Sequence, residues 1–378
     1  MTTARELVDR VLAEDQRLVR EAVKRAIPDA EPRRYLYDLV RAYQARSGKG
    51  FRASLCLAAC RAFGGRTEEA VDVAVALEFL HSAFLIHDDI EDGATLRRGQ
   101  PALHLSHGIA LALNAGDALC ALAMSSLARC VARQPPEVGG ALMAEVAHLF
   151  RRTVEGQALE LGWIADRTFD ITEADYLRMV LGKTCWYSTI HPCRLGALIG
   201  SKGSAQLKAL VPFGCYLGAA FQLRDDLDNL APGEEHYGKD VAGDIVEGKR
   251  TIPLLHLLAR CSDAQREEVK QVISSDCQLP REQRIGRVLQ LMTEFGSLEY
   301  ARDVTDDFAR LAIKEIPAAF AQANSLEDVE YFTAMVLYLS GALRPAVETR
   351  QGGCSSNGGE PASEVRGVWH FPPDARSM

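Results

Sequence analysis

Apolar residues recur at helical spacing along almost the whole chain. Runs rich in Ala, Leu and Val predict helices, because apolar residues three and four positions apart line one helix face. After a helical pattern over residues 7–27, they cover residues 51–64, 68–90, 107–132, 137–163, 173–200, 205–230, 250–260, 264–274, 284–297, 299–322 and 327–344. Strand-like alternation is nearly absent. The pattern therefore predicts an all-α protein.

These helices predict one domain over residues 1–345. From about Glu348 the composition shifts to Gly, Ser, Pro and Glu. Such a segment cannot bury enough apolar surface to offset the entropy of ordering, so we expect residues 346–378 to form a disordered tail.

Composition excludes some classes of protein. Of 378 residues, 47% are hydrophobic and 25% charged, as in ordinary soluble proteins, and the net charge of −8 argues against a nucleic-acid binder. The most apolar stretch, residues 71–90, is interrupted by charged residues, so no membrane span is expected. The ten cysteines form no CxxC pair and no zinc-type cluster. With no signal-peptide pattern, this predicts a cytoplasmic protein with reduced, buried thiols.

Two clusters of carboxylates end two apolar helices. In the first, Asp88-Asp89-Ile90-Glu91-Asp92, Asp88 and Asp92 project from one helix face. The second is Asp225-Asp226-Leu227-Asp228. Either cluster alone has an ordinary explanation as a solvated helix end. Together they indicate hard cations between facing helices, and carboxylate oxygens suit Mg²⁺ that bridges to phosphates.

Basic residues occur in small groups that suit the oxygens of a diphosphate. Each group alone is more typical of a charged surface. The groups are Lys49 with Arg52, Arg97 with Arg98, Lys183, Lys239, and Lys249 with Arg250.

These motifs resemble the trans-isoprenyl diphosphate synthases of the polyprenyl synthetase family over about residues 40 to 345. A single DDxxD motif is a weak signal, whereas many blocks in the family's order make a specific match. In that order the blocks are Lys49 and Arg52; His81; Asp88 to Asp92; Arg97-Arg98; Asn114 to Asp117; Glu155-Gly156-Gln157; Lys183-Thr184; Phe221 to Asp226; and Gly238 to Thr251.

The resemblance implies an isoprenoid-synthase-type helical bundle around a deep central cavity, acting as a homodimer. It also implies head-to-tail condensation of isopentenyl diphosphate with an allylic diphosphate, and three Mg²⁺ ions per site. The metal ligands would be Asp88, Asp92 and Asp225, with Asp89 in the same motif.

The resemblance also assigns the substrate-binding side chains. Those for the allylic diphosphate would be Arg97, Lys183 and Lys239, with Lys249 in support. Those for isopentenyl diphosphate would be Lys49, Arg52, His81 and Arg98. Thr184 and Gln222 resemble residues whose oxygens face the carbocation.

The chemistry places physical demands on such a site. Breaking the allylic C–O bond separates a carbocation from diphosphate, so cations must neutralise the leaving group. The carbocation must meet the isopentenyl double bond before water does, which requires an oriented, dry cavity. In the family the released diphosphate takes the final proton, so no side-chain base is assigned.

Three features depart from the family's pattern. Asn229 replaces the Asp at the fifth position of the second acidic motif, and Trp186-Tyr187 is bulkier than the residues that many members carry after Lys-Thr. The C-terminal tail has no family counterpart.

Product length is expected to depend on Ala83 and Phe84, which lie one helical turn before Asp88. One small and one aromatic residue there resembles members that reach twenty carbons, whereas two aromatics would suggest fifteen. We therefore predict geranylgeranyl diphosphate, with farnesyl diphosphate next. The alternative is that Phe84 only packs in the core.

Two other functions compete with the synthase. A terpene cyclase on the same fold would need the metal carboxylates but not the isopentenyl diphosphate site, so the presence of Lys49, Arg52, His81 and Arg98 favours the synthase. A non-catalytic subunit of a heteromeric synthase would be expected to lack the acidic motifs.

Overall fold

The computed structural model describes residues 3–46, 48–230, 242–274 and 276–342, and its regular structure is almost entirely helical. The α-helices are α1 Ala4–Ala26, α2 Asp38–Ala45, α3 Phe51–Ala62, α4 Thr67–Glu91, α5 Leu103–His107, α6 Ile109–Val131, α7 Pro136–Ala165, α8 Glu173–Val180, α9 His191–Gly200, α10 Leu210–Leu230, α11 Gly243–Glu247, α12 Ile252–Arg260, α13 Asp263–Val272, α14 Arg281–Glu294, α15 Ser297–Ala319 and α16 Leu326–Leu339. Two π-helical segments, η1 Arg33–Tyr37 and η2 Leu181–Ile190, and a 3₁₀ turn, η3 Leu207–Ala209, complete them. The all-α prediction is confirmed.

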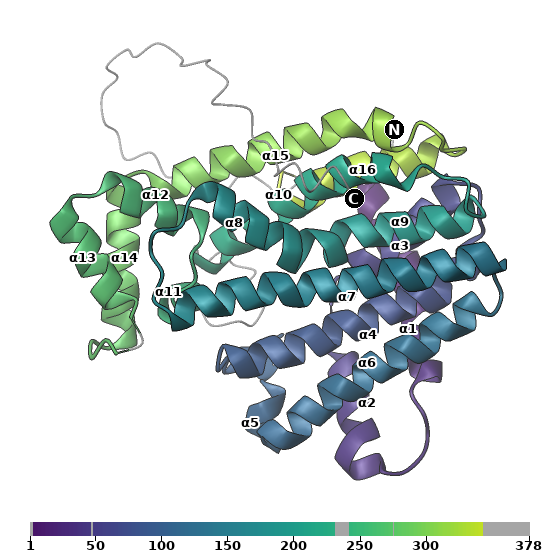
Figure 1. Ribbon diagram of the computed structural model, residues 1–378, viewed down its shortest axis with the longest axis horizontal. Helices are drawn as coiled ribbons and strands as arrows, with labels where there is room; N and C mark the ends of the chain where they lie inside the picture. Colours follow the sequence, from purple (N-terminus) through teal and green to yellow (C-terminus); the bar gives the residue numbers. More distant parts are fainter. Residues whose placement is uncertain (1–2, 47, 231–241, 275, 343–378) are drawn as a thin grey trace.

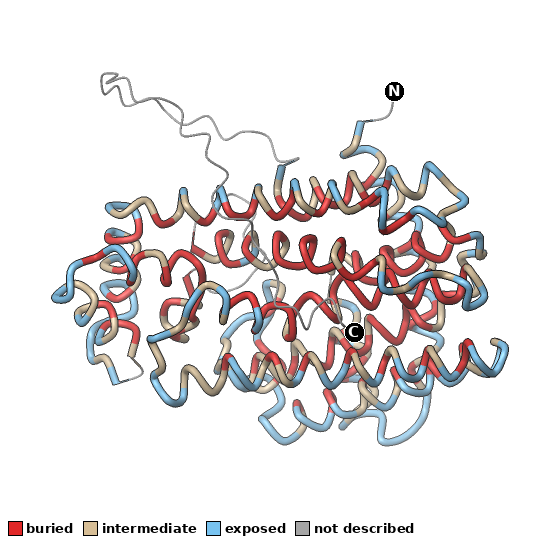
Figure 2. Tube along the Cα trace, turned by 45° about the horizontal axis from the view of Figure 1, so that its top comes forward, coloured by how far each residue is buried: buried red, intermediate tan, exposed pale blue. Residues whose placement is uncertain are grey.

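The long helices lie along the longest axis of the molecule, and α13 and α14 stand at one end (Figure 1). α10 packs against α15 and η2, α3 against α9 and α4, and α4 against α6. Buried residues follow the inner sides of these helices, while exposed residues mark the outer helices and the loops (Figure 2). Helix-on-helix packing therefore forms the core.

Local sequence signals explain several helix ends. Thr3 and Glu6 form a capping box at the start of α1, which satisfies two backbone N–H groups that the helix leaves without partners. Gly50 precedes α3 with a φ of 61°, a left-handed conformation that glycine adopts without strain. The chain can therefore turn sharply into α3, which is buried over almost its whole length.

The helix predicted over residues 173–200 is continuous but not uniform. It runs as α8, η2 and α9, and the wide π-helical turns end just before Pro192. Proline has no N–H to donate to the preceding turn, so regular α-helical bonding is interrupted there. The helix predicted from residue 205 begins at Leu210, after η3.

One short hairpin is the only sheet in the described part of the chain. β1 (Leu96–Arg97) pairs antiparallel with β2 (Gln100–Pro101) directly after the acidic end of α4. Arg98 in its turn has a φ of 55°, which is uncommon for a residue with a side chain. The hairpin turns the chain back, so that Arg97 and Arg98 lie close to residues of α4.

Several further expectations concern membranes, thiols and the tail. α4 and α6 are long and apolar enough to span a membrane by length and composition. In the fold, 61% of the most apolar 18-residue stretch of α4 is buried, and 33% of that of α6. The cysteines named below form no disulfide, and all are buried except partly exposed Cys120. They are Cys56, Cys60, Cys120, Cys130, Cys185, Cys193 and Cys215. The predicted tail lies outside the described residues.

Candidate active site

The acidic end of α4 lies against the β1–β2 hairpin. Because α4 is apolar around most of its surface, carboxylates at its buried end need partners. The Nε of Arg97 donates to Asp89 Oδ1 at 2.6 Å, and its Nη2 donates to Asp88 Oδ2 at 3.2 Å. Asp89 is 1% exposed and Arg97 6% exposed. The hairpin therefore brings a permanently charged guanidinium to the first acidic motif.

Lys249, which precedes α12, reaches the same motif from the other side. Its Nζ lies 2.7 Å from Asp92 Oδ2, 2.7 Å from Glu247 Oε2 and 3.7 Å from Asp244 Oδ1. Burial, reinforced by the neighbouring Asp88 carboxylate, raises the pKa of Asp92 to about 7. Lys249 therefore links the first acidic motif to the segment that carries Asp244.

Lys183 reaches Asp88 because α7 and η2 approach each other closely. A Cβ on Gly156 would overlap the backbone nitrogen of Lys183, and a Cβ on Gly182 would lie 2.9 Å from Gly156 Cα. The Nζ of Lys183 pairs with Glu160 and lies 3.4 Å from Asp88 Oδ1. Two glycines thus let the backbones touch and place an ammonium beside the carboxylates of α4.

Gln157 and Glu160 join the site, although neither was assigned a role from the sequence. Gln157 Nε2 donates to Glu91 Oε2 at 2.6 Å and to Asp88 Oδ1 at 3.4 Å. Gln157 belongs to the block Glu155-Gly156-Gln157, and Glu160 lies three residues further on the same face of α7, which was the available signal for Glu160.

The second acidic motif, at the end of α10, is held by a chain of hydrogen bonds. Thr184 Oγ1 donates to Gln222 Oε1 at 2.7 Å, and Gln222 Nε2 donates to Asp226 Oδ1 at 2.8 Å. The hydroxyl of Tyr176 donates a hydrogen bond to Asp226 Oδ2 at 2.6 Å. Burial, reinforced by Asp244, raises the pKa of Asp226 to about 7. Asp226 is thus an internal anchor, whereas Asp225 is exposed.

The last two residues of this motif have other partners. Asp228 pairs with Arg224 at 2.6 Å. Asn229 accepts the Asp244 N–H through Oδ1 at 3.2 Å and the Ala242 N–H through its carbonyl at 2.8 Å. Asn229 therefore positions the segment that carries Asp244. Lys239, predicted to bind the allylic diphosphate, lies outside the described residues.

A second group of cations gathers around His81, on α4. Arg52 Nη1 lies 3.3 Å and Arg98 Nη2 3.4 Å from His81 Nε2. Burial lowers the pKa of Arg98. Two guanidiniums brought to one imidazole in a partly buried position favour an anionic ligand there.

Lys49 was predicted to bind isopentenyl diphosphate together with Arg52, His81 and Arg98, but its ammonium contacts an aromatic ring on α16. Its Nζ lies over the ring of Tyr338, on α16, 5.6 Å from the centroid. The neighbouring Gly48 lies against Arg98, where a Cβ would be 2.8 Å from Nη2. The backbone of this segment therefore lies close to the Arg98 side chain.

The two predicted chain-length residues have different surroundings. Ala83 is fully buried in the core between helices. Phe84 is partly buried, and its ring centroid lies 5.5 Å from that of Phe150 and 5.4 Å from that of Tyr187. Aromatic side chains from α4, α7 and η2 therefore meet one turn away from Asp88.

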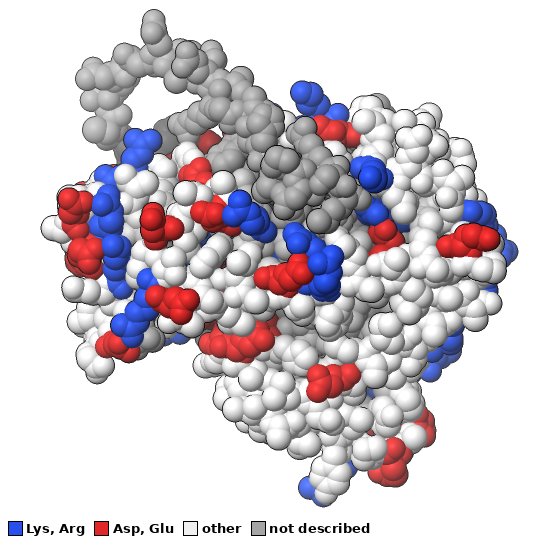
Figure 3. Space-filling view, in the orientation of Figure 1, with Lys and Arg blue, Asp and Glu red and all other residues white. Residues whose placement is uncertain are grey.

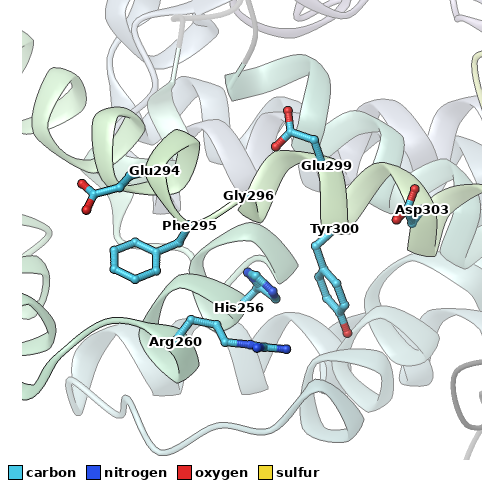
Figure 4. A pocket seen from close by; sticks show the side chains of 8 residues that line it. All are labelled: His256, Arg260, Glu294, Phe295, Gly296, Glu299, Tyr300 and Asp303. Carbon is cyan, nitrogen blue, oxygen red and sulfur yellow. The ribbon is translucent and has the colours of Figure 1, made fainter. Parts of the chain in front are cut away.

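A separate pocket of about 530 Å³ lies between α12, α14 and α15 (Figure 4). His256 stacks on Tyr300 there, with centroids 4.3 Å apart. Glu294, Glu299 and Asp303 line it, against one arginine, Arg260. This charge does not suit a diphosphate, and none of the predicted site residues lines the pocket.

Comparison with known proteins agrees with these motifs. The model of the family described as "Polyprenyl synthetase" matches residues 33–292. A short chain isoprenyl diphosphate synthase of Methanothermobacter thermautotrophicus is 31% identical over 330 residues, which cover 86% of this chain and 97% of that protein. Other relatives of similar identity include geranylgeranyl diphosphate synthases and an octaprenyl diphosphate synthase.

Solved structures share the fold. A geranylgeranyl pyrophosphate synthetase from Pyrococcus horikoshii aligns with a TM-score of 0.78 at 28% identity, covering 89% of this chain and 98% of that one. A polyprenyl synthase from Caulobacter crescentus, complexed with calcium and isoprenyl diphosphate, aligns with a TM-score of 0.75 at 28% identity, covering 90% and 98%. The chain therefore belongs to the polyprenyl synthetase family and is an isoprenyl diphosphate synthase, a prenyltransferase that condenses isoprenyl diphosphates in the trans configuration.

Proposed function

We propose that this synthase makes a short-chain product, geranylgeranyl diphosphate first and farnesyl diphosphate second. The observation that carries the proposal is the meeting of Phe84, Phe150 and Tyr187 one helical turn from Asp88. Four residues of helix span about 6 Å, so a prenyl chain that starts at the acidic motif reaches these rings early. Small Ala83 beside Phe84 supports twenty carbons over fifteen.

The carboxylates of the site fit a divalent metal that is shared with substrate. Asp88 and Asp92 lie one turn apart, and the raised pKa of Asp92 reflects first the burial of its carboxyl group and then the nearby charge of Asp88. Within the described ranges no three His, Cys, Asp or Glu side chains form a complete metal cage. Mg²⁺ usually keeps waters and phosphate oxygens as ligands, so such a cage is not required.

We assign Asp88, Asp92 and Asp225 as the ligands of Mg²⁺, with three ions per site. When bound, the metal would neutralise charge on the diphosphate leaving group.

The cations beside these carboxylates would bind the allylic diphosphate. Arg97 and Lys183 both contact Asp88, and Lys249 contacts Asp92. They can therefore orient the diphosphate and stabilise the charge that grows on it as the C–O bond breaks. Lys239 is proposed for the same role.

The oxygens of Thr184 and Gln222 are proposed to face the carbocation that remains. Because the Thr184 hydroxyl donates to Gln222 Oε1, a lone pair of the hydroxyl oxygen stays available toward positive charge. The carbocation then bonds to the isopentenyl double bond, and the released diphosphate takes the proton that is lost.

Arg52, His81 and Arg98 are proposed to bind isopentenyl diphosphate, together with Lys49. The shared position of both guanidiniums at His81 supports this assignment, because an anion there would relieve their mutual repulsion.

The first experiment is a product analysis. The purified chain is incubated with Mg²⁺, isopentenyl diphosphate and allylic starters of five, ten or fifteen carbons, and mass spectrometry identifies the alcohols after dephosphorylation. We expect a twenty-carbon alcohol. Mainly fifteen-carbon or much longer products would contradict the proposed length, and hydrocarbons formed without isopentenyl diphosphate would indicate a cyclase.

A paired substitution tests the metal ligands. Asp88→Asn is expected to lower kcat at least 100-fold with an unchanged circular dichroism spectrum, because it removes a ligand that acts on the leaving group. Asp306→Asn, on the exposed side of α15, serves as the control and should keep full activity. Equal activities of the two variants would exclude Asp88 as a ligand.

We further propose that the protein is a cytoplasmic homodimer that pairs through α6 and α7. Large apolar side chains are exposed along both helices, and Figure 3 shows few charged side chains over α6. They are Ile109, Leu113, Met124, Met143, Phe150, Val154 and Leu159. Large apolar side chains exposed along neighbouring helices are typical of an interface.

A further inference from the structure

Tyr187 occupies the point where the chain departs from the family's pattern after Lys183-Thr184. It lies on η2 next to Trp186, which is buried against the rings of His148 and His191. Tyr187 faces other partners, Phe84 on α4 and Arg52 on α3. A single side chain therefore contacts residues from both proposed halves of the active site.

The ring of Tyr187 meets the predicted chain-length residue. It lies edge-on to Phe84, with centroids 5.4 Å apart and planes at 82°. Phe84 is four residues before Asp88, and Tyr187 is four residues after Lys183, so both rings lie about one turn from the charged groups. The second aromatic ring at this level thus comes from η2, while position 83 is alanine.

The hydroxyl of Tyr187 contacts Arg52, which is proposed to bind isopentenyl diphosphate. Arg52 Nη2 donates to it at 2.9 Å, and the guanidinium lies 4.7 Å from the Tyr187 ring centroid. The other described bonds of this guanidinium go to Ser188 Oγ at 3.1 Å and His81 Nε2 at 3.3 Å. Arg52 is 6% exposed, so loss of an acceptor would not be replaced readily by water.

We propose that Tyr187 determines specificity in two ways: its ring closes the prenyl channel with Phe84, and its hydroxyl positions Arg52 for isopentenyl diphosphate. This inference rests on the proposed function. Phenylalanine at this position would keep the ring and lose the acceptor, whereas leucine would lose both. The two roles can therefore be separated by substitution.

The test compares three variants with the wild type. Tyr187→Phe is expected to raise KM for isopentenyl diphosphate about tenfold, with KM for the allylic starter and product length unchanged, because one hydrogen bond to a charged group is lost. Tyr187→Leu should raise the same KM and also lengthen the product by at least one five-carbon unit. Ser188→Ala is the matched control: it removes another acceptor of Arg52 but no ring, so KM should rise without a change in length.

Two results would overturn the inference. Unchanged product length in Tyr187→Leu would exclude the ring as a boundary, and unchanged KM in Tyr187→Phe would exclude the hydroxyl as a positioning group. If a variant loses turnover, calorimetric titration compares its affinity for isopentenyl diphosphate with that of the wild type, and circular dichroism checks that the variant is folded. A wild type that forms no prenyl diphosphate would instead contradict the proposed function.

Discussion

Arg97 and Asp89 are almost fully buried and hydrogen-bonded to each other, an arrangement with a large desolvation cost. Buried ion pairs of this kind often contribute little net stability, although breaking one by removing a single partner is costly. Their value here is positional, because the pair fixes a guanidinium beside Asp88 before substrate arrives.

Phe84 gives a prediction at the scale of one ring. Phe84→Ala is expected to lengthen the product by at least one five-carbon unit, because it opens the contact with Phe150 and Tyr187. Since the ring is only partly buried, the free energy of unfolding should fall by about 1–3 kcal/mol. Mass spectrometry of the dephosphorylated products measures the effect.

Leu85→Ala is the control for this substitution. It is the next residue on α4, about 100° around the helix, and also partly buried. A product shift in Leu85→Ala equal to that in Phe84→Ala would mean that general loosening of α4, rather than this ring, sets the length.

The motifs that carry the site residues could be predicted from the sequence, but the side chains that each of them contacts could not. The acidic motifs and the lysines and arginines follow from local spacing. The pairing of Lys249 with Asp92 joins positions 157 residues apart, and that of Arg52 with Tyr187 joins positions 135 apart. Such pairs depend on how helices pack, which no local pattern encodes.

At the scale of elements, the contact between α7 and η2 depends on Gly156. Gly156→Ala would place a methyl group on the backbone of Lys183, so the helices would have to separate. We expect a loss of about 1–3 kcal/mol in stability and a large loss of activity, because Lys183 would move away from Asp88. Thermal unfolding and steady-state kinetics measure the two effects.

Gly162→Ala provides the matched control on the same helix. A Cβ at Gly162 meets no atom within 4 Å, so alanine should be neutral or stabilise α7 by up to about 1 kcal/mol. If Gly156→Ala behaved in the same way, close backbone contact would not be needed to place Lys183.

Helix periodicity predicted the elements well and their irregularities poorly. The segment over residues 173–200 has apolar spacing typical of a helix, yet residues 181–190 form π-helical turns. Periodicity reports which face is buried, and a few wider turns hardly change that pattern. Pro192 was the available signal for the change.

A partly buried network joins α7 to α9 and predicts a pH dependence. His148 Nδ1 lies 2.9 Å from His191 Nε2, and His191 Nδ1 lies 2.8 Å from Glu145 Oε2. Burial, reinforced by His191, lowers the pKa of His148 to about 4. An unfolded histidine binds a proton near pH 6.5, so this group's contribution to stability is complete above that pH and is lost as the pH falls toward 4.

We therefore expect the Tm to fall between pH 6.5 and pH 4, and His148→Asn to reduce that slope. Glu145 should remain ionised over this range: burial alone would raise its pKa, but bonds from His191 and Arg194 lower it to about 2. Calorimetry across pH gives the slope. His107→Asn, on an exposed position of α5, is the control, and equal slopes in both variants would exclude this network.

At the scale of the whole molecule, the exposed apolar face of α6 and α7 predicts the oligomeric state. Met124→Glu would place a charge in the proposed interface, so the mass measured by light scattering should fall from dimer to monomer. Leu326→Glu is the control, because Leu326 is 84% exposed on α16, outside this face. A monomeric wild type would contradict the proposed dimer.

The ion pairs at the acidic motif also bear on how the protein can be handled. Asp88, Asp89 and Asp92 are matched by Arg97, Lys183 and Lys249, which come from three separate segments. These ion pairs therefore tie the acidic end of α4 to three other segments. The protein should keep its Tm during prolonged dialysis against EDTA, so that chelated stocks can be stored folded and activity started at will by adding Mg²⁺.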